Sequence, residues 1–278
     1  MRPPLRDKRA NDRLPPSKKS NARAAAAIAV DLDGTLLNSQ RMLSARNSAV
    51  ILKAAELGWT VIISTARPVR TIKLALPATF HCFYWAACNG AWLLKDGRIL
   101  QRREIPHEMA NRLISLLASR QRHFAVEADD LFFTDCAVPP GFIGDFYPLA
   151  KLGHRDACKI IVKVASKDEA RSVQEMLPEN CVAVITDNGS LVQVSHAHGN
   201  KLAAVACALE QEGVALENTI AFGDDNNDIS LLEAVGCGVA MGNGTAELKA
   251  VADHVGLTND EDGVAEFLEE YMRKVKSG

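Results

Sequence analysis

Two carboxylates one residue apart follow an unbroken apolar run near the start of the chain. Residues 27–30 read Ala-Ile-Ala-Val, and Asp31 and Asp33 come next, separated by Leu32. Small and β-branched residues in such a run predict a strand buried on both faces, as in the middle of a parallel sheet. Ligands bind beyond the carboxyl ends of such strands, and both carboxylates leave the backbone on the same side if the strand geometry persists. Gly34 then allows a sharp turn, so we expect a charged site here.

A second acidic group follows another apolar run near the other end of the chain. Residues 219–223 lead into Asp224 and Asp225 and, after two asparagines, into Asp228. Hard oxygen ligands from two adjacent strand ends are the ligands that Mg²⁺ requires. The alternative is a polar turn that caps the next helix, a part that Asp228 can also play.

Two further polar residues stand at comparable places. Thr65 ends a predicted buried strand, and Lys201 opens a predicted helix. Four polar features at strand ends or helix starts favour one shared site over unrelated surface features. Arg67 and Asn89 could belong to it, although an exposed arginine at a helix start and a plain turn asparagine are the simpler interpretations.

The elements that would position these residues alternate between strand and helix, with an interruption. Residues 44–57 predict a helix between two buried strands, and Asp96-Gly97 predicts a tight hairpin. From about Glu104, partly alternating strands and amphipathic helices without charged strand ends indicate a separate α+β module. The parallel-sheet pattern returns with Lys201. We therefore predict an α/β fold, a three-layer Rossmann-like parallel-sheet core with an inserted α+β cap: core 24–100, cap 101–190 and core 191–278.

The composition limits the partners and the setting of the chain. Residues 1–23 carry eight Lys and Arg against two Asp, with four prolines, which predicts a disordered basic tail, a targeting segment being the alternative. A net charge of −2 gives no reason to expect nucleic acid or an anionic membrane as partner. No apolar run approaches the roughly 20 residues of a membrane span. Seven scattered cysteines without a Cys-x-x-Cys pair predict reduced thiols and a cytoplasmic location.

The ordered polar features resemble the four motifs of the haloacid dehalogenase (HAD) superfamily. The motifs are Asp31-Leu32-Asp33-Gly34-Thr35, Ser64-Thr65-Ala66-Arg67, Lys201 and the segment 223–228. Asn89-Gly90-Ala91 and the segments 241–244 and 262–264 resemble the Cof-type sugar-phosphate phosphatase branch. In that branch an α/β cap of type IIB (C2B) is inserted between the second and third motifs. The resemblance runs from about residue 26 to residue 274.

The resemblance implies a catalytic role for each motif. Asp31 would attack phosphorus and form an aspartyl-phosphate, while Asp33 would protonate the leaving oxygen and then activate water. Lys201 would offset the repulsion between the two anions, and Thr65 would donate to phosphoryl oxygens. The implied Mg²⁺ ligands are Asp31, Asp33 through its backbone carbonyl, Asp224 and Asp228. The implied phosphate or substrate contacts are Leu32, Gly34, Ala66, Arg67, Asn89, Gly90 and Asn227.

The expected function is that of a Mg²⁺-dependent phosphatase for a small phosphorylated metabolite, either a sugar phosphate or a cofactor phosphate. The acid at Asp33 resembles phosphatases and phosphomutases, not the transport ATPases or dehalogenases of the superfamily. A phosphomutase is therefore one alternative, and a non-catalytic phosphometabolite-binding protein is another. We expect a monomer or weak homodimer whose cap determines the substrate, although residues 101–190 contain no motif that identifies it.

Overall fold

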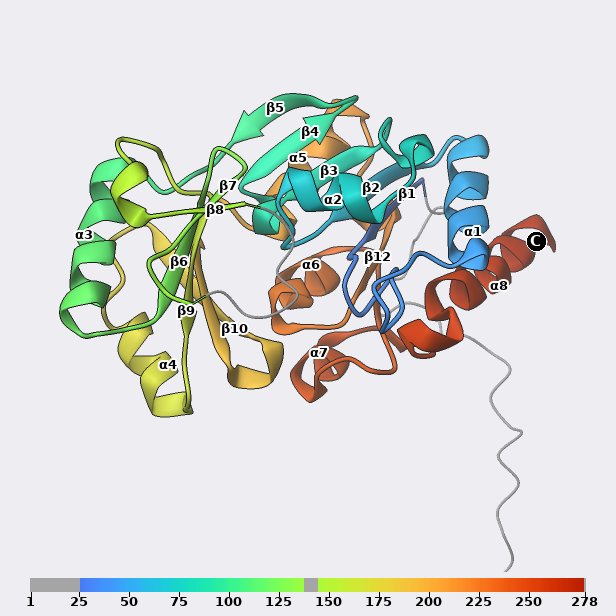
Figure 1. Ribbon diagram of the computed structural model, residues 1–278. Coiled ribbons are helices and arrows are strands. Elements are labelled where there is room, and N and C mark those ends of the chain that lie inside the picture. The colour runs from blue at the N-terminus through green and yellow to red at the C-terminus, as the bar shows by residue number, and fades with distance from the viewer. Residues whose placement is uncertain (1–25, 138–144, 278) are drawn as a thin grey trace, which may run out of the picture.

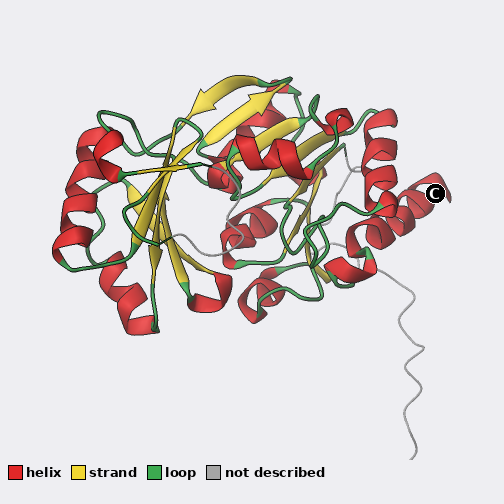
Figure 2. Cartoon of the chain, viewed as in Figure 1, coloured by secondary structure: helices red, strands yellow, loops and turns green. Residues whose placement is uncertain are grey.

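The computed structural model describes residues 26–137 and 145–277, which form two sheets, each with its own helices (Figures 1 and 2). The predicted tail, residues 1–23, lies outside the described residues. In the larger sheet the strand order is β14-β13-β12-β1-β2-β3-β4-β5. Its strands are β1 (Ala27–Val30), β2 (Thr60–Ser64), β3 (Tyr84–Ala87), β4 (Trp92–Lys95), β5 (Arg98–Arg102), β12 (Thr219–Gly223), β13 (Cys237–Ala240) and β14 (His254–Val255). The strands from β14 to β3 pair in parallel, and β4 and β5 form the predicted hairpin at one edge.

Helices cover both faces of this sheet because the side chains of its central strands alternate between two apolar layers. Ile28 and Val30 of β1 pack in the layer beneath α1 (Ala45–Glu56), α2 (Val69–Ala75) and α8 (Gly263–Ser277). Ala27 and Ala29 pack in the opposite layer, beneath α5 (Lys201–Gln211), α6 (Ile229–Ala234) and α7 (Ala246–Val251). The small alanines allow α5 to lie close to the sheet. The predicted three-layer α/β core is confirmed.

Ser44 and the glycine-containing hairpin show how local sequence determines the boundaries of elements in this core. The Ser44 hydroxyl accepts a hydrogen bond from the Asn47 N–H and so caps α1, as the sequence predicts. Asp96 and Gly97 both have positive φ angles, 51° and 72°, which is the geometry that an Asp-Gly turn provides between β4 and β5.

The second sheet belongs to the inserted cap and has the order β10-β11-β9-β6-β7-β8. Its strands are β6 (Phe124–Ala128), β7 (Leu131–Phe133), β8 (Phe146–Tyr147), β9 (Lys159–Lys163), β10 (Cys181–Thr186) and β11 (Leu191–His196). The helices α3 (His107–Ser119) and α4 (Lys167–Gln174) cover one face of this sheet, on the side away from the core (Figure 1). No helix among residues 26–137 and 145–277 is long and apolar enough to cross a membrane.

Both predicted cap boundaries need correction. The boundary at residue 101 falls inside β5, which pairs with β4 in the core sheet, so the cap begins after Arg102. The boundary at residue 190 excludes β11, which lies between β9 and β10 and pairs antiparallel with both. The cap sheet therefore runs through His196. Leu191–His196 is not among the predicted strands, although Val192 and Val194 alternate there with Gln193 and Ser195 as in a half-buried strand.

Candidate active site

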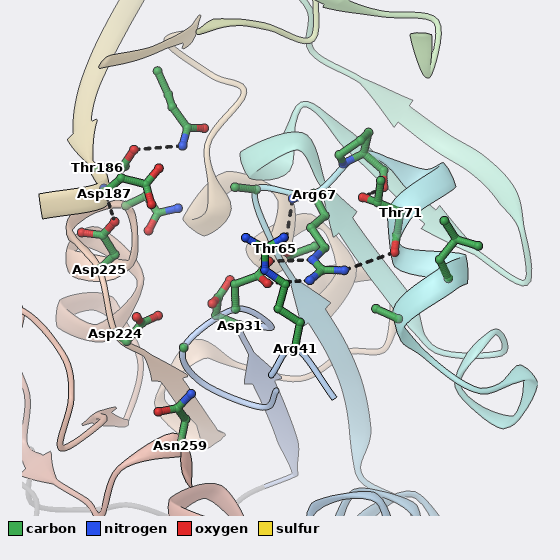
Figure 3. Close-up of a pocket in the computed structure, with 18 of the residues that line it drawn as sticks. Asp31, Arg41, Thr65, Arg67, Thr71, Thr186, Asp187, Asp224, Asp225 and Asn259 are labelled. Atoms are coloured by element: carbon green, nitrogen blue, oxygen red, sulfur yellow. Dashed lines mark hydrogen bonds and ion pairs between the residues drawn. The ribbon is translucent and has the colours of Figure 1, made fainter. Parts of the chain in front are cut away.

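A cavity of about 600 Å³ lies between the carboxyl ends of the core strands and the cap sheet. Asp31 follows β1, Thr65 follows β2 and Asp224 follows β12. Because β12, β1 and β2 are adjacent and parallel, their carboxyl ends bring these three residues together at the floor of the cavity (Figure 3). The cap supplies the opposite wall through Glu127, Thr186, Asp187 and Gln193.

Lys201 forms ion pairs with two of the acidic residues, Asp31 and Asp228. Its side chain is only 1% exposed, and Asn200 fixes the start of α5 by accepting a hydrogen bond from the Ala203 N–H. Nζ donates to Oδ1 of Asp31 at 2.8 Å and to Oδ1 of Asp228 at 2.7 Å. Burial alone would lower the pKa of Lys201, but the two carboxylates raise it above its ordinary value. The ammonium therefore stays charged and holds the Asp31 carboxylate in place.

Three carboxylates converge beside this lysine. Oxygens of Asp31, Asp224 and Asp228 lie within 4.8 Å of one another. Burial raises the pKa of Asp31 to about 7, against the opposing effect of Lys201, and burial with the charges of Asp31 and Asp228 raises the pKa of Asp224 to about 8. Burial also raises the pKa of Asp228. Two buried carboxylates and the half-buried one of Asp224, with one ammonium between them, leave an excess of negative charge, and hard oxygen donors are suited to a divalent cation such as Mg²⁺. The residues present fit this ion.

Gly34 gives Asp224 the space to reach this cluster. The glycine has a φ of +76°, and a Cβ atom on it would lie 2.1 Å from Oδ2 of Asp224. Its carbonyl accepts a hydrogen bond from Nδ2 of Asn243 at 2.8 Å, and the neighbouring Thr35 hydroxyl donates to Oδ1 of Asp224 at 3.1 Å. Only glycine combines this backbone conformation with such a close approach.

Asp33 is held by Arg67 in a bidentate ion pair. Nε and Nη2 of Arg67 each lie 2.6 Å from a different oxygen of the Asp33 carboxylate. The Arg67 side chain is 17% exposed, whereas that of Asp33 is 48% exposed at the cavity. The Arg67 backbone N–H donates to the Thr65 hydroxyl oxygen at 3.2 Å. Thus the second motif orients both an acid and a hydroxyl group toward the same space.

A row of side-chain amides connects the core to the cap. Nδ2 of Asn227 donates to Oδ1 of Asn89, and Nδ2 of Asn89 donates to Oε1 of Gln193 at 2.8 Å. Nε2 of Gln193 in turn donates to the Thr186 hydroxyl at 3.0 Å. Asn227, Gln193 and Thr186 line the cavity, while Asn89 lies behind them and orients the amides on either side.

The other residues predicted to bind phosphate or substrate differ in position. Gly34, Ala66 and Arg67 line the cavity. The Leu32 side chain is fully buried in the apolar core, so only its backbone is available to a ligand. A Cβ atom on Gly90 would lie 2.2 Å from the Asn200 carbonyl oxygen, and this glycine therefore allows the start of α5 to pack closely against the loop.

Sequence reasoning did not identify the cap residues that complete the cavity. Arg70 of α2 forms an ion pair with the buried Glu127 of β6, and Lys159 of β9 donates to the Ala66 carbonyl at 2.6 Å. Asp187 lies in the turn between β10 and β11, and its N–H donates to Asp225. The available signal was a single acidic residue in the otherwise apolar run of residues 124–128, which no spacing rule connects to the catalytic motifs.

The fold and this site together define a class of protein, a Rossmann-like α/β protein with an inserted cap and an acidic cluster at the carboxyl ends of its parallel strands. The model of the haloacid dehalogenase-like hydrolase family matches residues 28–268, and the chain belongs to that family. The predicted superfamily and Cof-type branch are thereby confirmed.

Similar proteins include several phosphatases. The 5-amino-6-(5-phospho-D-ribitylamino)uracil phosphatase YitU of Bacillus subtilis is 30% identical over 265 residues, which cover 88% of this chain and 97% of the relative. The pyridoxal phosphate phosphatase YbhA of Escherichia coli is 28% identical over 274 residues, covering 88% and 98%. A haloacid dehalogenase-like hydrolase from B. subtilis superposes with a TM-score of 0.80 at 26% identity, covering 88% of this chain and 99% of that one. The HAD subclass IIB sugar phosphatase BT4131 has the same fold, with a TM-score of 0.77 at 20% identity over 88% of this chain and 98% of its own. These relatives confirm the predicted enzyme class, a phosphoric monoester hydrolase.

Proposed function

We propose that this protein is a Mg²⁺-dependent phosphatase that hydrolyses a small phosphorylated metabolite through an aspartyl-phosphate on Asp31. The observation that carries the proposal is the Asp31 carboxylate, which lies at the floor of the cavity and is held by the ammonium of Lys201 at 2.8 Å. A carboxylate fixed in this way is suited to attack phosphorus in line with the leaving oxygen. The other oxygens of the phosphate then face Thr65 and the backbone N–H groups near Gly34.

Lys201 has two effects in this proposal. Its charge reduces the repulsion between the Asp31 carboxylate and the incoming phosphate, and its buried position keeps Asp31 from rotating. Asp228 accepts the second hydrogen bond of the ammonium and so keeps Lys201 directed at Asp31.

Asp33 is the proposed acid and base. It donates a proton to the leaving oxygen during formation of the aspartyl-phosphate, and its carboxylate then takes a proton from the water that attacks the intermediate. Its exposure at the cavity gives it access to both groups, and the ion pair with Arg67 determines its orientation.

Mg²⁺ would be held by Asp31, Asp224, Asp228 and the backbone carbonyl of Asp33. When bound, the ion supplies positive charge that stabilises the phosphoryl oxygens and allows two anions to approach each other. The raised pKa values of Asp31 and Asp224 support this assignment, because both carboxyl groups need a positive partner to be ionised near neutral pH.

Phosphate release tests the proposal directly. We expect the wild-type protein to release phosphate from p-nitrophenyl phosphate and from members of a panel of phosphorylated sugars, nucleotides and cofactors when Mg²⁺ is present. EDTA should stop the reaction. Asp31→Asn should abolish turnover, while Asp96→Asn, a change in the exposed hairpin turn, should leave it unaltered. Turnover by Asp31→Asn at the wild-type rate would refute the proposal, and isomerisation of a hexose phosphate without net release would indicate a phosphomutase instead.

Asp33→Asn distinguishes the two acidic roles. p-Nitrophenolate departs without a proton, whereas an alkoxide does not, so this variant should lose much more activity toward alkyl phosphates than toward p-nitrophenyl phosphate. Mass spectrometry after acid quenching should find the phosphoryl group on the peptide that contains Asp31. Equal losses on both substrate types would mean that Asp33 is not the acid.

A further inference from the structure

Two buried thiols lie where the cap meets the core, and the proposed phosphatase reaction uses neither of them. Cys88 follows β3 of the core and is 2% exposed, while Cys158 precedes β9 of the cap and is 1% exposed. Both pack in the apolar cluster that contains β1, and Cys158 is the one described cap residue in that cluster. Both are free thiols. The structure therefore brings one reduced thiol from each domain to a shared buried place.

Hydrogen bonds from the segments that carry these thiols meet at the second motif. The Cys88 N–H donates to the Arg67 carbonyl at 2.9 Å. Lys159 directly follows Cys158, and its Nζ donates to the Ala66 carbonyl at 2.6 Å. The side chains interact as well, because the Cys88 thiol, together with burial, raises the pKa of Cys158 well above its ordinary value. The backbone contacts and the side-chain interaction agree that the two sulfur atoms are neighbours.

The two thiols have neighbours of opposite charge. Burial lowers the pKa of Arg70, but two carboxylates and the Cys88 thiol raise it above its ordinary value, so the guanidinium lies beside Cys88. Sγ of Cys158 instead donates to Oε1 of Glu104 at 3.2 Å, and the Glu104 side chain is only 7% exposed. A positive neighbour stabilises a thiolate that attacks an oxidant, whereas a carboxylate can take the proton of the second thiol. The surroundings thus give the two thiols different roles.

Packing alone and a metal site are the alternative interpretations of this cluster. Two thiols and a carboxylate are possible zinc ligands, and a zinc site needs at least three of them within reach of one ion. Within residues 26–137 and 145–277, no group of three potential ligands close enough to hold a metal includes Cys88 or Cys158. A disulfide needs only the two neighbouring sulfur atoms. Packing alone would be served equally well by serine, so serine variants distinguish it from a redox role.

We propose that Cys88 and Cys158 form a redox-sensitive pair that hydrogen peroxide converts to a disulfide between the cap and the core. The Cys88 sulfur attacks one oxygen of the peroxide and the O–O bond breaks, which gives a sulfenic acid on Cys88 and one molecule of water. The Cys158 sulfur then attacks the Cys88 sulfur, and the S–O bond breaks. Glu104 takes the thiol proton of Cys158, and the departing hydroxide recovers it as a second molecule of water. The peroxide is reduced and the two thiols are oxidised.

A covalent bond at this place stops turnover because the cavity lies between the two domains that it joins. The core supplies the floor of the cavity and the cap supplies one wall, so substrate enters and products leave as the cap moves off the core. The same movement gives a small oxidant access to the thiols, which are buried in the position that the structure shows. Oxidation therefore fixes the cap on the core, and reduction releases it.

Peroxide treatment of the whole protein and peptide mapping without reduction test the pair directly. Trypsin leaves Cys82 and Cys88 on one peptide, residues 74–95, so the map is made with Cys82→Ser. We expect a disulfide between this peptide and residues 156–159, a loss of most of the turnover of p-nitrophenyl phosphate, and reversal of both by dithiothreitol. Tm of the oxidised protein should rise by about 4–16 °C, as for an ordinary disulfide in a chain of this length. Formation of the disulfide without loss of turnover, or loss of turnover without this disulfide, would overturn the inference.

Single serine variants separate a redox pair from packing. Cys88→Ser and Cys158→Ser should keep wild-type turnover when reduced and should resist peroxide, because each lacks one of the two sulfur atoms. Cys82→Ser is the matched control, since Cys82 is an exposed thiol, and it should lose turnover in peroxide as the wild type does. Resistance of Cys82→Ser, or full sensitivity of Cys88→Ser and Cys158→Ser, would overturn the inference. If one of the paired variants fails to fold, the other and the peptide map decide.

Dimedone, which labels sulfenic acids, tests the order of the two steps. In Cys158→Ser the sulfenic acid on Cys88 has no second thiol to react with, so dimedone should label Cys88; in Cys88→Ser it should leave Cys158 unlabelled. Labelling of Cys158 and not of Cys88 would overturn the assignment of Cys88 as the attacking thiol. Absence of turnover in the reduced wild-type protein would instead refute the proposed phosphatase function, while the peptide map and Tm would still detect the disulfide.

Discussion

Replacing Lys201 by methionine should destabilise the metal-free protein in a way that depends strongly on pH. The ammonium is fully buried between Asp31 and Asp228, and its removal leaves two buried carboxylates without a partner. Breaking a buried ion pair in this manner costs about 3–5 kcal/mol. At roughly 2–4 °C per kcal/mol for a protein of this size, the expected loss in Tm is about 6–20 °C.

The pH dependence follows from the direction of the pKa shifts. The pKa of Asp31 in the folded protein is about 7, raised mainly by burial and opposed by Lys201, so the variant should raise it further. A carboxyl group with a raised pKa in the folded state contributes stability at low pH, and this contribution is lost as pH rises through that pKa. The defect of Lys201→Met should therefore be small near pH 5, where the folded state takes up a proton, and full near pH 8.5.

Urea unfolding of the metal-free proteins at pH 5 and pH 8.5 measures this difference. The control is Lys95→Met, because Lys95 pairs with Glu212 at 2.6 Å but both side chains are about one-third exposed. Such a pair is worth about 0–1 kcal/mol, so the control should lose little at either pH. A loss for Lys201→Met that is equal at the two pH values would refute the reasoning, since it would mean that the lysine contributes through packing and not through its charge.

Three further predictions concern the acidic cluster. Mg²⁺ should raise Tm more at pH 8.5 than at pH 6. The reason is that protons compete with the ion for Asp31 and Asp224, whose pKa values are raised to about 7 and about 8. An increase in Tm that is the same at both pH values would contradict this prediction. Gly34→Ala should lower kcat about 100-fold, because the added Cβ atom displaces the Asp224 carboxylate. The control is Gly58→Ala, since Gly58 also has a positive φ, +83°, but no atom lies within 4 Å of its added Cβ atom, so this variant should keep wild-type activity. Steady-state kinetics of both variants test this prediction. Thr35→Val removes a hydrogen bond to Asp224 and should shift the midpoint of the Mg²⁺ effect upward by about one pH unit, which thermal scans across pH would detect.

The floor of the site could be predicted from the sequence because each of its residues belongs to a local pattern. Asp31, Thr65 and Asp224 each stand directly after an apolar run, and parallel strands bring their ends together whatever the rest of the chain does. Lys201 could be located by its place at a helix start, and the structure adds that it lies between two carboxylates. The ion pair of Asp33 with Arg67 was beyond prediction, since it depends on the side-chain conformations of residues from two different strand ends.

The cap wall could not be predicted because no local pattern determines it. Glu127, Asp187 and Gln193 lie on different segments of the cap, and only the pairing register of β6, β9, β11 and β10 brings them to one face. A shift of one residue in that register would turn Glu127 toward α3 and α4 and an apolar neighbour toward the cavity. The proposed catalytic residues Asp31, Thr65 and Asp224 are positioned by strand ends, which tolerate such a shift, whereas the cap residues that line the cavity are positioned by the register, which does not. The floor and the cap wall of the cavity thus depend on separate features of this chain, and a change in the register of the cap sheet can alter the wall without disturbing the floor.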